Sequence, residues 1–245
     1  MGTIVVGRIP NTNSNMTFPC SGVILSGGLS TRFDGAHKAF MRVGGKRIID
    51  RLYEVFSDLF DEIILVTNHP EQFLNLDLTI VTDIFDLRSS LTGIHAGLFY
   101  MKNPYAFFSA CDTPFLNKAL VEILVEQIEQ KFDIIMPETA AGFEPLCAIY
   151  SKRCLKPAEQ HLKEKKLKIQ RAFRSNRIKN IPENILRQGD PELKSFFNIN
   201  TPEDLARAEA MVAEDRGQRT DDRGQTYLNS ELGMRNSERK KEERD

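Results

Sequence analysis

The sequence predicts an α/β fold built on an open, mostly parallel β-sheet. From residue 22 onward, short runs of valine, isoleucine and leucine alternate with segments of helical pattern. These runs are apolar throughout, which is typical of parallel strands buried on both faces of a sheet. The length of 245 residues and the 41% content of hydrophobic side chains allow one large domain or two small ones.

The first half of the chain contains the clearest strand and helix patterns. The expected strands are, in order, GVILS at 22–26, EIILVT at 62–67, LTIVT at 78–82, YAFFSA at 105–110 and FDIIMP at 132–137. Helices are expected between them, from about Arg47, from Gly93 and from Asn117. Each helix would connect two neighbouring strands and cover one face of the sheet.

The second half is less regular. We expect a strand at PLCAIY (145–150), a charged helix over 154–167 and a strand at KSFFNI (194–199). A last helix is expected over NTPEDLARAEAMV (200–212), because Thr201 suits the N-cap position and Pro202 suits the first turn.

The two ends of the chain differ in composition from the middle. Residues 1–16 show no sustained periodicity, so we expect a flexible leader followed by a folded domain over 17–213. Residues 214–245 are charged and nearly free of large apolar groups, which cannot offset the entropy of ordering. We therefore expect a disordered tail there.

The composition narrows the class of function. Lysine plus arginine number 33 against 34 acids, giving a net charge of −1, so bulk electrostatics give no reason to expect nucleic-acid binding. We expect no membrane span, since no apolar run approaches the required length of about 20 residues, and no secretion signal. The four cysteines are scattered, which favours reduced thiols and a cytoplasmic location.

The segment SGGLSTRFDGAHK, at 26–38, connects the first strand to the first helix. In open α/β sheets this connection is the usual phosphate site. Gly27 and Gly28 allow positive φ and a close approach of backbone N–H groups to an anion. Arg32 and Lys38 add positive charge, and Ser26 and Ser30 add hydroxyl donors. Neither GxxxxGK[ST] nor GxGxxG is present, and a glycine pair after a strand is equally typical of a plain turn.

Two aspartates and an asparagine follow other strands of the same expected sheet. Asp112 comes directly after YAFFSA, where its carboxylate would lie at the same edge as the glycine loop and suit Mg²⁺ bound to a nucleotide triphosphate. Asp83 and Asn68 follow their strands in the same way and could contact a base, a ribose or the metal. Capping of a turn is the alternative role for all three residues.

A second substrate could approach the segment after Asp83. Arg88 and Ser89 lie there, and the expected helix at Gly93 would direct its N-terminus toward an anion.

The segment LSGGLSTRFDGAHKAF resembles the signature LAGGxSxRMGxxKxLL of the molybdenum cofactor guanylyltransferases. The resemblance continues in the family's order through LVTN, IVTD with LTGIHAGL, CDTPFL, EPLCAIY and FFNINTPEDL, and covers residues 21–211. It implies the Rossmann-like, three-layer fold of the nucleotidyltransferases. It also implies transfer of GMP from Mg-GTP to molybdopterin cofactor, with release of pyrophosphate.

The resemblance assigns roles to individual residues by motif. It implies that the guanine nucleotide is held by Leu25, Ser26 and Gly27, with further GTP contacts from Lys38, Asn68 and Asp83. It implies that Asp112 binds both the nucleotide and Mg²⁺, and that Lys38 and Asp112 act in catalysis. The partners implied are a molybdopterin-donating protein and acceptor molybdoenzymes or their chaperones.

The sequence departs from the family signature at several positions. Ser26 replaces the usual alanine, Phe33 and Asp34 replace Met-Gly, and His37 replaces a common aspartate. Asp34 places an extra carboxylate near the expected phosphates. The stretch SSLTG, at 89–93, replaces a GPLAG-like stretch, which makes the base and cofactor contacts there less secure.

Alternative functions remain open at this stage. The cytidylyltransferases of the same cofactor tend to have LAAG where this chain has LSGG, and Gly27 lacks the methyl group that would crowd a purine. Sugar-phosphate and isoprenoid nucleotidyltransferases usually place proline before the lysine, where His37 stands. A nucleotide-binding regulator without turnover and an interaction scaffold that acts through the tail are hypotheses of other classes.

Overall fold

The computed structural model of the protein describes residues 4–5, 20–27 and 37–215. Its main element is a nine-stranded sheet in the order β1-β6-β5-β2-β7-β10-β8-β11, with β9 paired to β8. The strands are β1 (Ile4–Val5), β2 (Ser21–Leu25), β5 (Ile63–Val66), β6 (Thr79–Val81), β7 (Tyr105–Ala110), β8 (Ile134–Thr139), β9 (Gly142–Phe143), β10 (Cys147–Ser151) and β11 (Ile178–Pro182).

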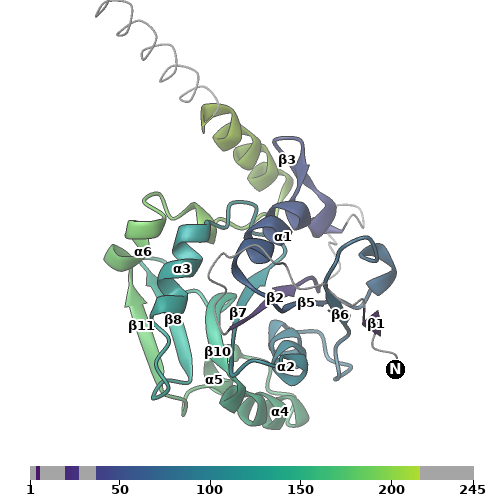
Figure 1. Ribbon diagram of the computed structural model, residues 1–245, viewed down its shortest axis with the longest axis vertical. Helices are drawn as coiled ribbons and strands as arrows, with labels where there is room; N and C mark the ends of the chain where they lie inside the picture. Colours follow the sequence, from purple (N-terminus) through teal and green to yellow (C-terminus); the bar gives the residue numbers. More distant parts are fainter. Residues whose placement is uncertain (1–3, 6–19, 28–36, 216–245) are drawn as a thin grey trace, which may run out of the picture.

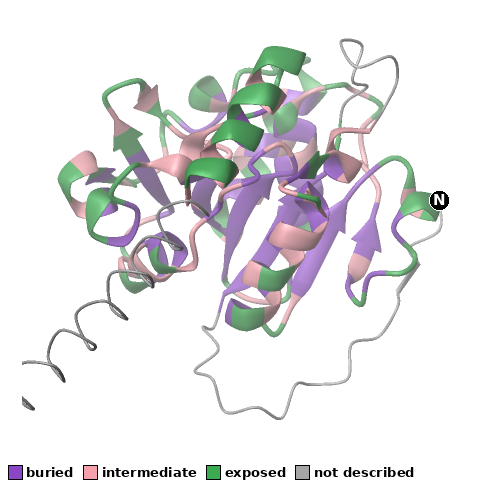
Figure 2. Cartoon of the chain, turned by 90° about the horizontal axis from the view of Figure 1, so that it is seen from above, coloured by how far each residue is buried: buried purple, intermediate pink, exposed green. Residues whose placement is uncertain are grey.

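Helices cover both faces of the sheet (Figure 1). One face carries α1 (Ile48–Leu59), α3 (Lys118–Glu126) and α6 (Glu183–Gly189), and the other carries α2 (Ser90–Tyr100), α4 (Leu155–Lys163) and α5 (Ile169–Ala172). The strands are buried between these layers, while exposed residues lie on the outer sides of the helices (Figure 2). The predicted three-layer α/β fold is therefore confirmed.

The apolar strand runs are explained by the two-sided core. Phe107 of β7 packs with Phe56 and Phe60 of the α1 layer, and its neighbour Phe108 packs with Tyr150 in the core beneath α2 and α4. Successive side chains of a strand point to opposite faces, so a sheet buried on both faces needs apolar residues at every position. Close packing also depends on Gly97 of α2, where an added Cβ would lie 2.6 Å from Phe108.

The sheet contains an antiparallel strand that the sequence pattern does not reveal. β6, β5, β2 and β7 are mutually parallel, and β8 is parallel to β11. Between these groups β10 runs antiparallel to both β7 and β8. The predicted strand at 145–150 is thus present, with its direction reversed relative to its neighbours.

Three expectations about local structure are wrong. The segment 194–199 is no strand: its first residues form a 3-10 turn, η4 (Lys194–Phe196), because the Asp190 carboxylate accepts a hydrogen bond from the Ser195 backbone N–H. The charged helix over 154–167 is shorter. A 3-10 turn, η3 (Lys152–Cys154), precedes α4, and the backbone of Lys165, at φ 55°, ends the helix with hydrogen bonds typical of a Schellman motif. Helix α2 begins at Ser90, ahead of Gly93.

The chain termini add two observations. Ile4 and Val5, within the segment expected to be a leader, pair antiparallel with β6. The last helix is described over residues 202–215 and projects beside a small hairpin of β3 (Arg42–Val43) and β4 (Lys46–Arg47) (Figure 1).

The predicted tail from residue 216 onward lies outside the described residues. Within those residues, no helix has the length and apolar character that a membrane span requires.

Candidate functional site

A cleft of about 520 Å³ lies at the carboxyl ends of the parallel strands β2, β5, β6 and β7. This is the edge where open α/β sheets bind ligands. Seven of the site residues predicted from the sequence line this cleft, namely Leu25, Ser26, Gly27, Lys38, Asn68, Asp83 and Asp112.

Lys38 lies at the centre of the polar contacts in the cleft. It begins a 3-10 turn, η1 (Lys38–Phe40), whose N-cap is His37. Its ammonium Nζ lies 3.3 Å from Asp112 Oδ2 and 2.7 Å from Asn200 Oδ1. The side chains of Lys38 and Asp112 are each 22% exposed, so both remain accessible to a ligand in the cleft.

Asn200 contacts Lys38, although the sequence analysis assigns Asn200 no role of its own. It belongs to the connection before the last helix, 162 positions beyond Lys38. The backbone N–H of Ile199 donates to the Asp112 carbonyl at 2.9 Å, which fixes this connection beside the end of β7. The signal available in the sequence was the motif FFNINTPEDL, which contains Asn200.

The start of the glycine loop continues strand β2 into the cleft. The Ser26 backbone N–H donates to the Val66 carbonyl at 2.8 Å, while the Ser26 hydroxyl oxygen is buried without a hydrogen-bond partner among the described residues. Among the described residues, a Cβ added at Gly27 would meet no atom within 4 Å. Gly27 allows positive φ but does not adopt it in the structure. The predicted contributions of Gly28, Ser30, Arg32, Phe33 and Asp34 lie outside the described residues.

Asn68 and Asp83 form a reciprocal pair across the ends of β5 and β6. The Asn68 amide Nδ2 donates to Asp83 Oδ2 at 2.9 Å, and the Asp83 backbone N–H donates to Asn68 Oδ1 at 3.3 Å. Burial raises the pKa of Asp83, and the hydrogen bond from Asn68 offsets this only in part. The second carboxylate oxygen of Asp83 is buried with no partner among the described residues, so with respect to them it can still accept a donor or a cation.

The N-terminus of α2 forms another wall of the cleft. Arg88, Ser89 and Gly93 line it as anticipated for a second substrate. The Ser89 hydroxyl caps the helix by accepting from the Thr92 backbone N–H at 3.2 Å. Gly93 contributes close packing, because a Cβ there would lie 3.2 Å from the Leu25 side chain.

His37, His69 and Cys111 also line the cleft. Burial, together with nearby His69, lowers the pKa of His37 below its ordinary value, so His37 is largely neutral at pH 7. Burial raises the pKa of the Cys111 thiol to about 12, and the adjacent Asp112 carboxylate acts in the same direction. Cys111 therefore stays a thiol, which excludes it as an activated nucleophile.

The oxygen groups of the cleft fit a magnesium ion that arrives with phosphates. Among the described residues, no three His, Cys, Asp or Glu side chains form a metal-binding cluster. Mg²⁺ needs only one or two protein carboxylates when phosphates and water supply its other ligands. The accessible Asp112 carboxylate and the unpartnered oxygen of Asp83 provide donors of this kind in one cleft.

Comparisons with known proteins agree with this geometry. A sequence profile described as the MobA-like NTP transferase domain matches residues 22–180, which include every predicted site residue. The chain belongs to the MobA-like NTP transferase family. Its members carry a nucleotidyltransferase domain, and the match ends within β11, which runs from Ile178 to Pro182.

Relatives within the MobA-like family cover most of the chain. A molybdenum cofactor guanylyltransferase of Desulfosudis oleivorans is 44% identical over 192 residues, which are 78% of this chain and 95% of the relative. A probable molybdenum cofactor guanylyltransferase of Natranaerobius thermophilus is 39% identical over 198 residues, covering 79% and 96% of the two chains.

Solved structures agree with the MobA-like fold. The molybdopterin-guanine dinucleotide biosynthesis protein A of Archaeoglobus fulgidus has a TM-score of 0.71 and 28% identity, covering 79% of this chain and 99% of that one. A 2-C-methyl-D-erythritol 4-phosphate cytidylyltransferase of Thermus thermophilus, at 17% identity and a TM-score of 0.60 over 80% of this chain and 98% of its own, shares the fold alone.

Proposed function

We propose that the protein is a molybdenum cofactor guanylyltransferase, which transfers GMP from Mg-GTP to the phosphate of molybdopterin cofactor and releases pyrophosphate. The single observation that carries the proposal is the meeting of Lys38 and Asp112 at 3.3 Å in the cleft that Leu25, Ser26 and Gly27 enter. The names of the relatives support the guanylyl reaction over the cytidylyl alternative.

The glycine loop and Lys38 would bind and orient the triphosphate. No atom of the described residues would meet a Cβ at Gly27, so these residues leave room for a nucleotide to approach the backbone beside the end of β2. The Lys38 ammonium, held between Asp112 and Asn200, is placed to neutralise phosphate charge. Binding of a phosphate there would compete with these internal contacts, which keep the charged group oriented beforehand.

Asp112 would hold Mg²⁺, with Asp83 as the second available carboxylate. Bound Mg²⁺ supplies neutralisation of the charge that develops on the phosphates during transfer. Asn68 orients Asp83 through the reciprocal hydrogen bonds, and one Asp83 oxygen has no partner in the described part of the chain. Both carboxylates thus serve as fixed oxygen donors.

The reaction is a direct displacement at the α-phosphorus of GTP. An oxygen of the molybdopterin phosphate forms a new P–O bond, and the bond from the α-phosphorus to the bridging oxygen breaks, so pyrophosphate leaves with that electron pair. No covalent enzyme intermediate is needed, which agrees with the protonated state of Cys111. The Arg88 and Ser89 wall is the proposed approach of the second phosphate.

The proposal includes the setting of the reaction. We place the enzyme in the cytoplasm, where the four buried, unpaired cysteines are stable as thiols. A molybdopterin-donating protein and the acceptor molybdoenzymes or their chaperones are the proposed partners.

Product identification tests the function directly. The full chain is incubated with Mg²⁺, GTP and molybdopterin cofactor, and the nucleotide product and pyrophosphate are measured by mass and by coupled assay. We expect the guanine dinucleotide of the cofactor, at a rate well above that with CTP. Tight GTP binding without pyrophosphate release would instead indicate a regulator, and faster turnover with CTP would indicate a cytidylyltransferase.

A further inference from the structure

The connection that precedes the last helix brings Asn200 to Lys38 at the catalytic cleft. Asn200 Oδ1 lies 2.7 Å from the Lys38 ammonium Nζ, whereas Asp112 Oδ2 lies 3.3 Å from it. Of these two contacts, the one with Asn200 is therefore the closer. Such an orienting contact matters because a flexible lysine side chain loses rotamer entropy when it binds a ligand, and prior orientation reduces that loss.

Asn200 is itself held by a side chain of the last helix. The Asp204 carboxylate oxygen Oδ2 accepts hydrogen bonds from the backbone N–H groups of Asn200 and Thr201, each at 3.0 Å. In return, the Thr201 hydroxyl oxygen accepts from the Asp204 backbone N–H at 3.2 Å. The reciprocal bonds between Thr201 and Asp204 form a capping box, which fixes the start of the helix.

The bond between Asn200 and Asp204 goes beyond what a capping box needs. A capping box satisfies the backbone N–H groups of the N-cap residue and of the third helical residue, which are here Thr201 and Asp204. Asn200 precedes the N-cap, so its N–H bond to Asp204 adds nothing to the hydrogen bonds of the helix itself. The bond instead fixes the backbone of the residue that contacts Lys38.

The same connection is anchored on its other side by the end of β7. The backbone N–H of Ile199 donates to the Asp112 carbonyl at 2.9 Å, and the Ile199 side chain is fully buried. Asn200 therefore lies between two anchors, with Ile199 on one side and Asp204 on the other. A side chain on a backbone fixed in this way is preorganised for its contact.

The Asp204 carboxylate is ionised at neutral pH. The hydrogen bond from the Asn200 backbone is the main cause that holds the pKa of Asp204 below its ordinary value of 3.8, and Thr201 and Arg207 act in the same direction. An ionised acceptor forms stronger hydrogen bonds than a neutral one. Asp204 is not one of the residues that line the cleft, so its carboxylate acts on the backbone of Asn200 and not on a ligand.

We propose that Asp204 is a positioning residue, which acts through Asn200 to hold the Lys38 ammonium in the orientation that binds the phosphates of GTP. The inference rests on the proposed function, because it takes GTP as the ligand of Lys38. In this role Asp204 contacts neither the nucleotide nor the metal. Asn200, as the closer partner of Lys38, also keeps the ammonium from pairing fully with Asp112, whose carboxylate stays available for Mg²⁺.

Calorimetric titration of the full chain with GTP in the presence of Mg²⁺ tests the proposal. Asp204→Ala removes both accepted hydrogen bonds, and the dissociation constant of GTP should rise about fivefold, the scale of one lost hydrogen bond. Asp204→Asn keeps an acceptor oxygen at the same place, so its dissociation constant should lie within about twofold of the wild type. Equal affinity of Asp204→Ala and the wild type would overturn the proposal. An equal loss in Asp204→Asn and Asp204→Ala would assign the effect to charge, and would also overturn it.

Two control variants separate the positioning role from general damage to the helix. Thr201→Val removes the N-cap acceptor and leaves the bond between Asn200 and Asp204 in place. Glu203→Ala removes an exposed acid from the same helical turn, and with it a comparable interaction with the helix dipole. Both controls should bind GTP within about twofold of the wild type, even where thermal unfolding shows a loss of stability. A loss of affinity in Thr201→Val as large as that in Asp204→Ala would assign the effect to fraying of the helix and overturn the proposal.

A double-mutant cycle tests whether Asp204 acts through Lys38. In the Lys38→Met background, Asp204→Ala should change the dissociation constant of GTP by less than about twofold, because the group that Asp204 orients is gone. The full effect of Asp204→Ala in that background would show that Asp204 acts by another route, and would overturn the proposal.

Amide hydrogen exchange gives a readout that needs no nucleotide. In Asp204→Ala, the Asn200 backbone N–H should exchange at least about tenfold faster than in the wild type, while the Ile199 N–H keeps its bond to the Asp112 carbonyl and its protection. Unchanged exchange at Asn200 would overturn the proposal. A wild type that binds no GTP would overturn the proposed function together with this proposal, whereas GTP binding that is equal in the wild type and Asp204→Ala would overturn this proposal alone.

Discussion

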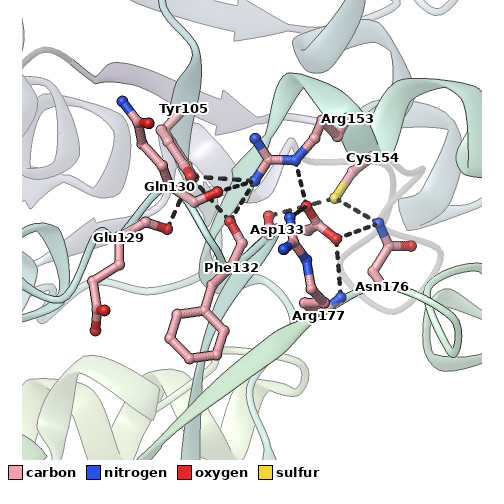
Figure 3. Close-up of polar contacts among 9 residues, drawn as sticks. All are labelled: Tyr105, Glu129, Gln130, Phe132, Asp133, Arg153, Cys154, Asn176 and Arg177. Carbon is pink, nitrogen blue, oxygen red and sulfur yellow. Dashed lines mark hydrogen bonds and ion pairs between the residues drawn. The ribbon is translucent and has the colours of Figure 1, made fainter.

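The carboxylates at the two edges of the sheet differ in how well the protein satisfies them. Asp112 and Asp83 follow β7 and β6 at the carboxyl edge, whereas Asp133 precedes β8 at the opposite edge, because β7 and β8 both run antiparallel to β10. Asp133 receives hydrogen bonds on both carboxylate oxygens (Figure 3), while Asp83 has a buried oxygen with no partner among the described residues.

This difference separates a structural role from a ligand-binding role. Burial alone would raise the pKa of Asp133, but hydrogen bonds from the Arg177 backbone and the Arg153 side chain hold it below the ordinary value. Burial of Asp83, with less compensation, leaves its pKa raised. A saturated carboxylate stabilises the fold, and an unsaturated one in a cleft is available for a ligand.

The largest effect is expected for Asp112→Asn. Removal of the charge that holds Mg²⁺ should lower nucleotidyl transfer about 100-fold, the scale for loss of a group that stabilises transition-state charge. Thermal unfolding should change little, because the Asp112 side chain is 22% exposed and, of the cations that the structure describes, its charge pairs with Lys38 alone. Asp86→Asn, at an exposed acid that does not line the cleft, is the matched control and should retain full activity. Wild-type turnover in Asp112→Asn would remove this residue from the site.

Asp133→Asn should lower the stability of the fold and leave the transfer activity unchanged. The amide keeps one acceptor but loses the charge that Arg153 and Arg177 surround, so the free energy of unfolding in urea should fall by about 2–3 kcal/mol. Asp58→Asn, at an exposed ion pair, should cost less than about 1 kcal/mol. Transfer activity of the folded Asp133→Asn protein should remain normal. A large loss of activity with unchanged stability would reverse the assignment of roles.

The pH dependence of stability should also follow Asp133. Its depressed pKa contributes stability that is present above the unfolded value of about 3.8 and is lost as the pH falls through the folded pKa. The stability difference between wild type and Asp133→Asn should therefore shrink in acid. A difference that stays constant from pH 7 to pH 3 would contradict the charged role.

Lys38→Met should weaken GTP binding about tenfold, which corresponds to about 1.4 kcal/mol. The variant keeps most of the side-chain volume and loses the ammonium that contacts Asp112 and Asn200. Lys118→Met serves as the control, because this lysine pairs with Asp58 outside the cleft. Calorimetric titration with GTP measures both, and an unchanged dissociation constant for Lys38→Met would count against phosphate binding.

Asp83→Asn should give the smallest change in the free energy of unfolding, and this change should be zero or stabilising. Because the pKa of Asp83 is higher in the folded protein than in the unfolded chain, ionising Asp83 lowers the stability of the fold. This loss of stability is absent below the pKa of the unfolded chain. It is fully present once the pH is above the pKa of the folded protein. The variant should therefore be equal to or slightly more stable than wild type at pH 7, by less than about 1 kcal/mol, while Mg-GTP binding weakens a few-fold. Clear destabilisation at pH 7 would show that Asp83 has a structural role like that of Asp133.

The sequence predicted the fold and the cleft well because strand order determines where strand ends meet. Lys38, Asn68, Asp83 and Asp112 each follow a strand directly or within one connection, so a parallel sheet brings them to one edge. The role of Asn200 could not be predicted from the sequence, because its contact with Lys38 spans 162 positions and no local pattern encodes such a contact.

Other features depend on tertiary contacts that periodicity does not report. The direction of β10 follows from pairing with both β7 and β8, since its apolar run would suit either direction. The segment 194–199 has the composition of a strand, yet Asp190 and Asn117 form hydrogen bonds with Ser195 that favour a turn.

We propose that Lys38 and Asp112 hold one Mg-GTP together in the cleft at the carboxyl edge. The most direct test is the dissociation constant of GTP with and without Mg²⁺, measured for wild type and Asp112→Asn. We predict that Mg²⁺ tightens GTP binding to the wild type at least tenfold and has little effect on the variant. An equal effect of Mg²⁺ on both proteins would contradict the claim.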